Sequence, residues 1–308
     1  MNYTLPPIGV VLIINYISKK DYSSKNINLI NCIAVIIGGI SAYFLKFGIS
    51  SINAIIVTSL ITIVGNYINN KIMIIKVVVV VMKISELNAE YDKLQLQYGA
   101  KELTSIYNGG CTNNPDFCFV FMNPTGKNIA SDPNWKGRRS PWIGTKNIWK
   151  LFYRIGLLDE EIYNGIMSKK PQEWDEKFAD LVYADVEKHK YFITNLGKCT
   201  QVDARVLPNS VYSQYLDLLC KEIEIINPKT IITLGNQVSS IVLDKNISVS
   251  QCRKQNFLKN IAGMEYKVYP VYYPIGNGMV NIDKAIEDLN FIIKTNTKSQ
   301  KDIEDFER

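Results

Sequence analysis

The chain has 308 residues, a formal net charge of +6 and a single histidine. This length predicts one large domain or two smaller ones. One histidine argues against a His-based catalytic triad and against metal sites that need several imidazole ligands. Residues 1–81 hold six Lys and one Asp, so most of the net charge lies there. The rest is nearly neutral, so any nucleic-acid site in it would be a local patch.

The first 81 residues are strongly apolar. The stretches 27–45 and 49–68 are each close to the ~20 residues that a helix needs to span a bilayer. Lysines flank the pair and Lys46 lies between the two stretches, so the positive-inside rule predicts both ends in the cytoplasm. Two interpretations stay open. Residues 1–81 are a membrane segment that holds the protein at the inner face of the cell membrane, or they are an over-extended start of a cytoplasmic protein that begins at Met82.

From Met82 the sequence alternates between helical and strand patterns. Helices are predicted over 83–107, 148–155, 159–168, 172–188, 210–226, 236–243 and 282–294, with a frayed charged tail. Apolar runs bounded by turn residues predict strands at 116–122, 191–195, 230–235 and 266–272. This alternation predicts an α/β domain over 82–308. Its three layers, α/β/α, enclose a central, mostly parallel four-stranded sheet.

Polar or Gly-rich residues follow each predicted strand. Asn123 follows the first strand, Asn195 ends the second, Gly235 ends the third, and Tyr273–Gly278 follow the fourth. Ligands of such sheets bind beyond the carboxyl ends of the strands. The four strand ends therefore predict a site on one rim of the sheet. Taken alone, the sequence Asn-Pro-Thr-Gly from residue 123 is also an ordinary turn.

Five segments between residues 116 and 294 together resemble the uracil-DNA glycosylase superfamily. They are Phe121–Gly126, Ser140–Gly144, Ile193–Cys199, Asn227–Gly235 and Val268–Pro274. The first is similar to the Asn-Pro version of the family's first motif, which its mismatch-specific and single-strand-selective branches use. The fourth is similar to a helix-to-strand passage of the iron–sulfur branches. The order and spacing of the segments carry the resemblance.

The resemblance implies hydrolysis of the N-glycosidic bond of uracil or a related damaged base that is flipped out of DNA. Asn123 would position the attacking water, Trp142 would stack on the base, and Asn195 would read its edge. The remaining residues implied at the substrate are Met122, Pro124, Gly276, Asn277 and Gly278. The resemblance further implies a slow monomeric enzyme acting on single-stranded or uracil-containing DNA.

The second motif departs from the family. Active relatives usually carry His where this chain has Tyr273, and that His stabilises the negative charge on the leaving base. A phenol can donate a hydrogen bond to the anion, but its reference pKa is about 10. This departure keeps a second interpretation open, in which the same fold binds nucleic acid or a nucleotide without cutting it.

The six cysteines bear on a cofactor. Cys199 lies where the resemblance implies one ligand of a 4Fe-4S cluster, and Cys111 and Cys118 lie near the other early ligands. The spacing of Cys111 and Cys118 differs from the tight pairs of such sites. The position expected for the last ligand lies nearer Tyr215 than Cys220. The prediction is therefore free thiols and no cofactor or metal, with the cluster as the alternative.

A local basic patch accompanies the site. It consists of Lys127, Lys136, Arg138 and Arg139, interleaved with Trp135 and Trp142. Cations beside aromatic rings suit single-stranded or flipped DNA, although a solvated loop has the same composition. A metal nuclease would need clustered carboxylates, and the rim offers only Asp203 and Asp132. These two residues are the alternative groups for activating water.

Overall fold

The computed structural model describes residues 33–38, 40, 55–65, 67, 83–204 and 207–306. The chain divides into two compact units, Met1–Val79 and Val80–Arg308. Much of the two predicted spans, 27–45 and 49–68, lies outside the described residues. Within the described ranges, no helix is both long and apolar enough to cross a membrane. The membrane segment therefore stays a prediction.

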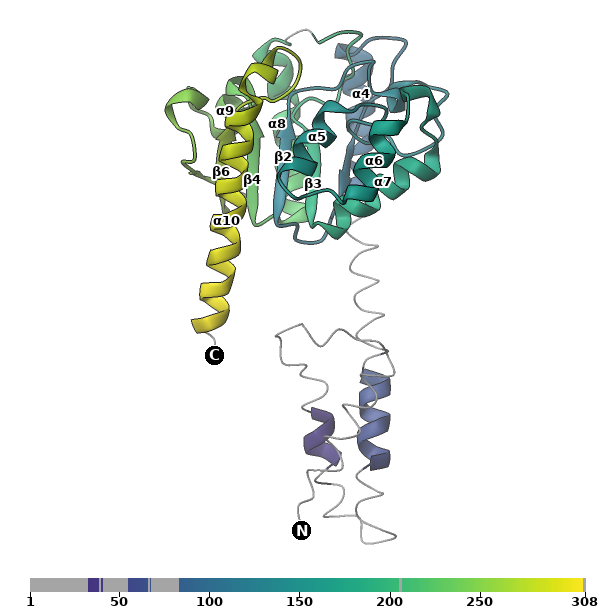
Figure 1. The fold of residues 1–308 in the computed structure, drawn as a ribbon, viewed down its shortest axis with the longest axis vertical. Helices are drawn as coiled ribbons and strands as arrows, with labels where there is room; N and C mark the ends of the chain where they lie inside the picture. The colour runs from purple at the N-terminus through teal and green to yellow at the C-terminus, as the bar shows by residue number, and fades with distance from the viewer. Residues whose placement is uncertain are drawn as a thin grey trace. The chain divides into compact units, whose positions relative to one another are not determined.

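The second unit is built on a mixed six-stranded sheet (Figure 1). Its strands are β1 (Asn108–Gly110), β2 (Phe117–Phe121), β3 (Tyr191–Asn195), β4 (Thr230–Leu234), β5 (Phe257–Ile261) and β6 (Met264–Val271). Their order across the sheet is β1-β3-β2-β4-β6-β5. The inner four, β3-β2-β4-β6, are parallel to one another, and each edge strand is antiparallel to its neighbour.

The four inner strands are those that the sequence predicts. The predicted number of strands is wrong, because the sheet has two further strands, one at each edge. The edge strand β1 has three residues, two of them Gly, so it carries no apolar run. The other edge strand, β5, alternates exposed and partly buried residues instead of being wholly apolar. It joins β6 through a tight turn at Ala262 and Gly263, both with positive φ.

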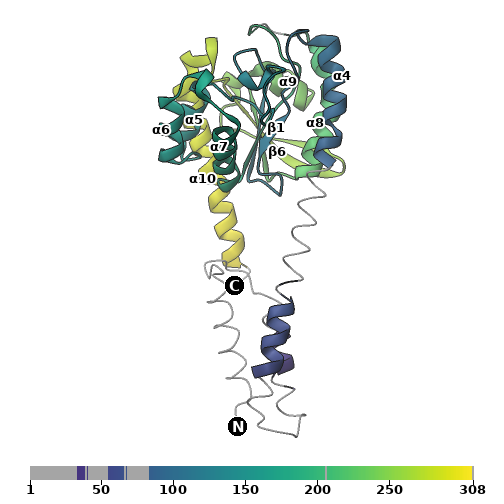
Figure 2. The same ribbon diagram turned by 90° about the vertical axis from the view of Figure 1, so that its right-hand side faces the viewer.

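Helices cover both faces of the sheet, which confirms the α/β/α layering (Figure 2). They are α4 (Asn88–Tyr98), α5 (Asn147–Arg154), α6 (Glu160–Ser168), α7 (Glu176–Lys188), α8 (Asn209–Ile226), α9 (Asn236–Leu243) and α10 (Ile282–Phe306), with short 3-10 turns η1 (Ile129–Ser131), η2 (Pro171–Glu173), η3 (Val249–Gln251) and η4 (Gly276–Asn281). Buried residues of α5, α6, α7 and α10 pack on one face. Those of α4, α8 and α9 pack on the other.

Some helix ends differ from the sequence prediction. Helix α4 ends at Tyr98 and not at 107, because Gln95 turns back to bind the loop through Nε2, 3.0 Å from the carbonyl oxygens of Ala100 and Leu103. At the other end of the chain, α10 continues past Lys294 to Phe306. Predicted and observed helices otherwise agree within a few residues.

The strand order fixes where a ligand would bind. Strand β2 is followed in the chain by β3 on one side of it and by β4 on the other. The connection to β3 carries α5, α6 and α7, and the connection from β3 to β4 carries α8 on the opposite face. Such a reversal of strand order opens a crevice beyond the carboxyl ends of the strands. In this chain the reversal occurs at the end of β2, two residues before Asn123.

Candidate functional site

Backbone hydrogen bonds join the carboxyl ends of the inner strands. Beyond β2 and β3, Leu196 N donates to Phe121 O (2.7 Å) and Gly197 N to Met122 O (2.8 Å). Beyond β4 and β6, Gly235 N donates to Val271 O (2.8 Å). The rim that the sequence predicts is therefore a continuous structure, and the residues after its four strands lie close together.

Three aromatic rings meet at the end of β2. The ring centroid of Phe121 lies 5.0 Å from that of Trp142 and 6.4 Å from that of Tyr273, both edge to face. Trp142 holds a left-handed backbone with a φ of 68°, which is uncommon for a bulky residue. Its carbonyl oxygen accepts hydrogen bonds from Thr145 Oγ1 (2.7 Å) and Trp149 Nε1 (3.2 Å). Thr145 thus fixes the Trp142 turn, and α5 has no side-chain cap.

Asn195 ends β3 directly beside Phe121. Side chains two positions apart on a strand point to the same face, so Asn195 shares a face with Tyr191 and Ile193. Both of these residues belong to the core on the Trp142 side of the sheet. Asn195 is 2 % exposed, and its Nδ2 has no hydrogen-bond partner among the described residues. A buried amide donor without a partner is costly. A ligand that brings an acceptor to this position would remove that cost.

Asn123 is held firmly at the rim. It is 9 % exposed. Its Oδ1 accepts a hydrogen bond from Tyr212 Oη (2.6 Å), and its Nδ2 donates to Pro124 O (3.2 Å). Tyr212 belongs to α8, and the sequence places it only on the apolar stripe of that helix. No local pattern distinguishes it from a core tyrosine, so the sequence gives no signal of this contact.

Tyr273 begins the turn after β6. Burial raises the pKa of its hydroxyl to about 12. The backbone at Gly278 packs closely against the backbone of Tyr273: a Cβ at Gly278 would lie 1.9 Å from the carbonyl oxygen of Tyr273. Gly276 has a positive φ of 58°, and the side chain of Asn277 is not described. Past the glycines, Met279 and Val280 are 42 % and 86 % exposed.

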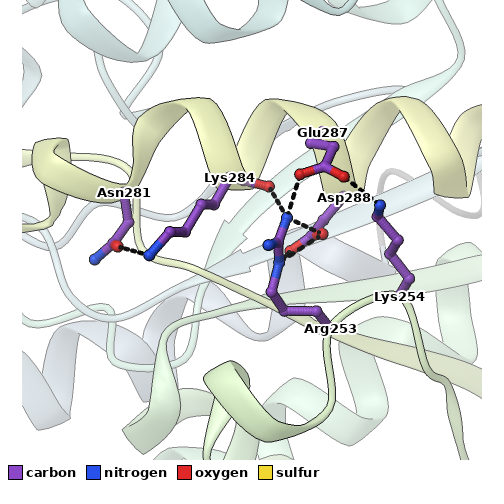
Figure 3. Close-up of polar contacts among 6 residues, drawn as sticks. All are labelled: Arg253, Lys254, Asn281, Lys284, Glu287 and Asp288. Atoms are coloured by element: carbon purple, nitrogen blue, oxygen red, sulfur yellow. Dashed lines mark hydrogen bonds and ion pairs between the residues drawn. The ribbon is translucent and has the colours of Figure 1, made fainter.

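An ionic cluster fixes the far side of this turn (Figure 3). Arg253, which follows η3, donates from Nε to both carboxylate oxygens of the buried Asp288 (3.0 and 3.1 Å) and from Nη2 to Glu287 (2.6 Å). Both acids lie on α10, which continues directly from η4. Lys284 on the same helix reaches back to Asn281 Oδ1 (3.4 Å). The glycine turn is therefore anchored at its end, while its exposed tip is not part of the cluster.

The predicted basic patch is divided in the structure. Lys127 and Lys136 are exposed. Arg138 is paired with Asp180 (2.9 Å) and lies over the ring of Tyr183 (4.7 Å), so part of its charge is already compensated. Arg139 is half-buried. The two lysines are therefore the cations of this patch best able to meet phosphate.

No three of the cysteines that the structure describes lie close enough together to hold a metal ion. Among the described residues, the group of three potential ligands that lie within 4.8 Å of one another is Asp159, Asp185 and His189, without a cysteine. Cys199 is buried beside Gln201 (3.9 Å from Sγ to Nε2). Burial raises the pKa of its thiol, which disfavours the thiolate that iron would need. The cysteines of the described ranges therefore do not fit a four-cysteine cluster.

The single histidine lies away from the rim. His189 precedes β3, whereas the candidate site follows the carboxyl ends of the strands. Its Nε2 lies 2.9 Å from Asp159 Oδ1. Asp132 accepts from the backbone N of Asn134 (2.8 Å) in an exposed loop, and Asp203 is exposed too. Their use as groups that activate water stays a prediction.

Comparison with protein families agrees with this architecture. Residues 110–290 match the model of the uracil DNA glycosylase superfamily. No curated protein matches the chain. The matched region is more than half of the chain and contains the four inner strands, the Trp142 loop and the glycine turn. The chain belongs to the uracil DNA glycosylase superfamily.

Proposed function

We propose that the protein releases uracil or a related damaged base from DNA by hydrolysing its N-glycosidic bond. The observation that carries this proposal is the buried Nδ2 of Asn195, which has no hydrogen-bond partner in the described part of the chain and lies on the same side of the sheet as Trp142 and Tyr273. A flipped uracil is flat and offers carbonyl oxygens along its edge. An amide donor and aromatic rings are the groups that recognise such a base.

The proposed reaction is dissociative. The bond between the sugar C1′ and the base nitrogen breaks, and its electron pair leaves with the base. Water then forms a new bond to C1′ of the oxocarbenium-like sugar, and the proton that it loses neutralises the anionic base. Asn123 orients this water, because an amide is too weakly basic to take its proton early. Tyr273 donates a hydrogen bond to the anionic base. The backbone N–H groups of residues 276–278 supply further donors for the base or a phosphate.

The rim also offers contacts to the DNA chain. Lys127 and Lys136 would bind phosphates near the pocket. Met279 and Val280 present apolar side chains at the tip of η4. Apolar side chains of this kind can insert between bases and stabilise an unstacked nucleotide. The combination favours DNA whose target base is already unstacked, as in a single strand.

The test is base release from a single-stranded oligonucleotide that contains one uracil. The protein is incubated with the labelled strand, and alkali then converts abasic sites into breaks. We expect breaks at the uracil and none in the same strand with thymine. Intact uracil strands under all conditions would contradict the proposal.

A non-catalytic module is the second candidate. Tyr273, at the position where active relatives usually carry His, favours it. Measuring both DNA binding and base release distinguishes the enzyme from the binding module. Tight binding of the uracil strand with no free base formed, even at stoichiometric protein, would identify a binding module.

Truncating the stacking residue should weaken DNA binding. We expect Trp142→Ala to reduce the affinity for the uracil strand by ~1–3 kcal/mol, the usual contribution of one stacked base. Trp142→Phe keeps a flat ring and should lose less. Fluorescence anisotropy titrations measure both. Equal affinity of wild type and Trp142→Ala would remove Trp142 from the base pocket.

The rate of base release should be flat between pH 6 and 9. Tyr273 donates its hydrogen bond only while protonated, and with a pKa of about 12 it loses the proton only well above this range. Asn123 does not titrate. Tyr273→Phe should lower the rate about 10-fold at every pH, the effect of one hydrogen bond. A rate that rises or falls through a pKa between 6 and 8 would show that another group takes part.

A further inference from the structure

The hydrogen bond between Tyr212 and Asn123 crosses from one helical layer to the rim. Tyr212 is fully buried among the residues of α4, α8 and α9, and its Oη reaches Asn123 Oδ1 at 2.6 Å. This distance is at the short end for a hydroxyl donating to oxygen. The residue proposed to orient water is thus held by a helix that contributes no other side chain to the proposed pocket.

A glycine provides the space for this contact. A Cβ at Gly197 would lie 3.1 Å from the ring of Tyr212 and 3.6 Å from Cβ of Asn123. The distance of 3.1 Å to the Tyr212 ring is shorter than an ordinary van der Waals contact, so a side chain at position 197 would force the ring to move. Gly197 itself is fixed by its N–H, which donates to Met122 O (2.8 Å). The turn after β3 therefore leaves room for the tyrosine ring directly beneath Asn123.

Two contacts together orient the Asn123 amide. An amide can turn by 180° and exchange its oxygen with its NH2 group, and only the oxygen accepts from water. The Tyr212 hydroxyl donates to the oxygen, and Pro124 O accepts from the NH2 group (3.2 Å). A turned amide would lose the bond to Pro124 and place its oxygen against that carbonyl oxygen, so the NH2 group faces Pro124 and the oxygen faces the Tyr212 hydroxyl. Burial, with the nearby Cys199 thiol as a smaller cause, raises the pKa of Tyr212, so its hydroxyl keeps the proton that it donates.

We propose that Tyr212 is a positioning residue that fixes the side-chain oxygen of Asn123 toward the attacking water, with Gly197 providing the space for it. The inference rests on the proposed role of Asn123. It names a group outside the pocket on which the geometry of the reaction depends.

Single-turnover rates on the uracil strand test the effect on catalysis in the full-length protein. Tyr212→Phe removes the hydroxyl and keeps the ring, so base release should slow about 5- to 10-fold, the effect of one ordinary hydrogen bond. DNA affinity should stay within about 2-fold. The matched control is Tyr215→Phe, which deletes a buried hydroxyl on the same helix and should keep the wild-type rate. In an Asn123→Ala background, Tyr212→Phe should cause no further loss. An unchanged rate in Tyr212→Phe, or the same loss without Asn123, would overturn the proposal.

The side-chain amide signal of Asn123 tests the positioning itself and needs no catalysis. In NMR spectra of protein labelled with 15N-Asn, this signal is identified by its absence in Asn123→Ala. Tyr212→Phe should shift or broaden it, and Tyr215→Phe should not. An Asn123 signal that is unchanged by Tyr212→Phe would overturn the inference even if the protein is active. A wild type that releases no base, with the shift observed, would reject the proposed function and leave the contact established.

Discussion

Asn123→Ala should lower the rate of uracil release by about 10²–10³-fold, the usual cost (~2.7–4 kcal/mol) of removing one positioned polar group from a reacting centre. The change removes the amide that we propose orients water, and it leaves the Tyr212 hydroxyl without its acceptor. Asn123 lies in the loop after β2 and belongs to no strand or helix. The fold should therefore survive, and the loss should appear in the rate of bond cleavage.

Single-turnover kinetics at saturating protein measure this rate, and DNA titrations show whether binding is kept. Asn164→Ala on α6 is the matched control, because Asn164 is exposed and lies on a different part of the domain. It should keep the wild-type rate. If Asn123→Ala releases uracil as fast as the wild type, another group activates the water, and Asp132 and Asp203 become the candidates.

Glu222→Met should destabilise the second unit by ~3–5 kcal/mol, the cost of leaving one partner of a buried ion pair alone. Glu222 is wholly buried in α8, and its Oε2 accepts from Lys198 Nζ (3.0 Å) and Thr194 Oγ1 (2.6 Å). Its Oε1 accepts from Asn108 Nδ2 (2.6 Å). The substitution removes the acceptor of all three donors and leaves the Lys198 ammonium without a counter-charge.

Denaturant unfolding followed by tryptophan fluorescence measures this loss, because all four tryptophans lie in the second unit. The double variant Lys198→Met with Glu222→Met should be more stable than Glu222→Met alone, since no isolated charge remains. Glu90→Gln breaks the exposed pair with Lys93 and should change stability by less than about 1 kcal/mol. A Glu222→Met protein as stable as Glu90→Gln would show that the pair contributes little.

The same buried pair bears on the site. Lys198 Nζ also donates to the carbonyl oxygen of Asn195 (3.0 Å). Asn108, which binds Glu222, accepts at its carbonyl oxygen from Ser140 Oγ (2.7 Å), two residues before Trp142. One set of buried and partly buried hydrogen bonds therefore links Glu222 to both proposed base-binding elements. We expect Glu222→Met to weaken uracil-DNA binding where the protein remains folded.

The inner part of the fold could be predicted from the sequence because its signals are local. Strands β2 and β4 are each a continuous buried run, and such runs are typical of central parallel strands. The edge strands lack this signal. Their pairing depends on neighbours far along the chain, as when Gly109 pairs with Ile193. Two glycines and a half-exposed pattern do not indicate a strand on their own.

The same distinction applies to the site. Asn123, Asn195 and Tyr273 could be placed on one rim because each directly follows or ends a predicted strand. The Tyr212 contact could not be predicted, because it joins residues 89 positions apart and Tyr212 has the spacing of a core residue. The ion pair between Arg138 and Asp180 could not be predicted either, because the sequence around a loop arginine does not indicate whether an acidic residue from elsewhere in the chain pairs with it.

The strand order delays the pairing of β2 while the chain is being synthesised. Strand β2 is the centre of the sheet and is synthesised early, yet both of its partners come later. About 70 residues separate Phe121 from the start of β3, which at a synthesis rate of roughly 5–20 residues per second takes several seconds. During that time the Phe-Cys-Phe-Val-Phe strand has both edges open and high β propensity. Residues 117–121 therefore stay without either of their strand partners until β3 has been synthesised.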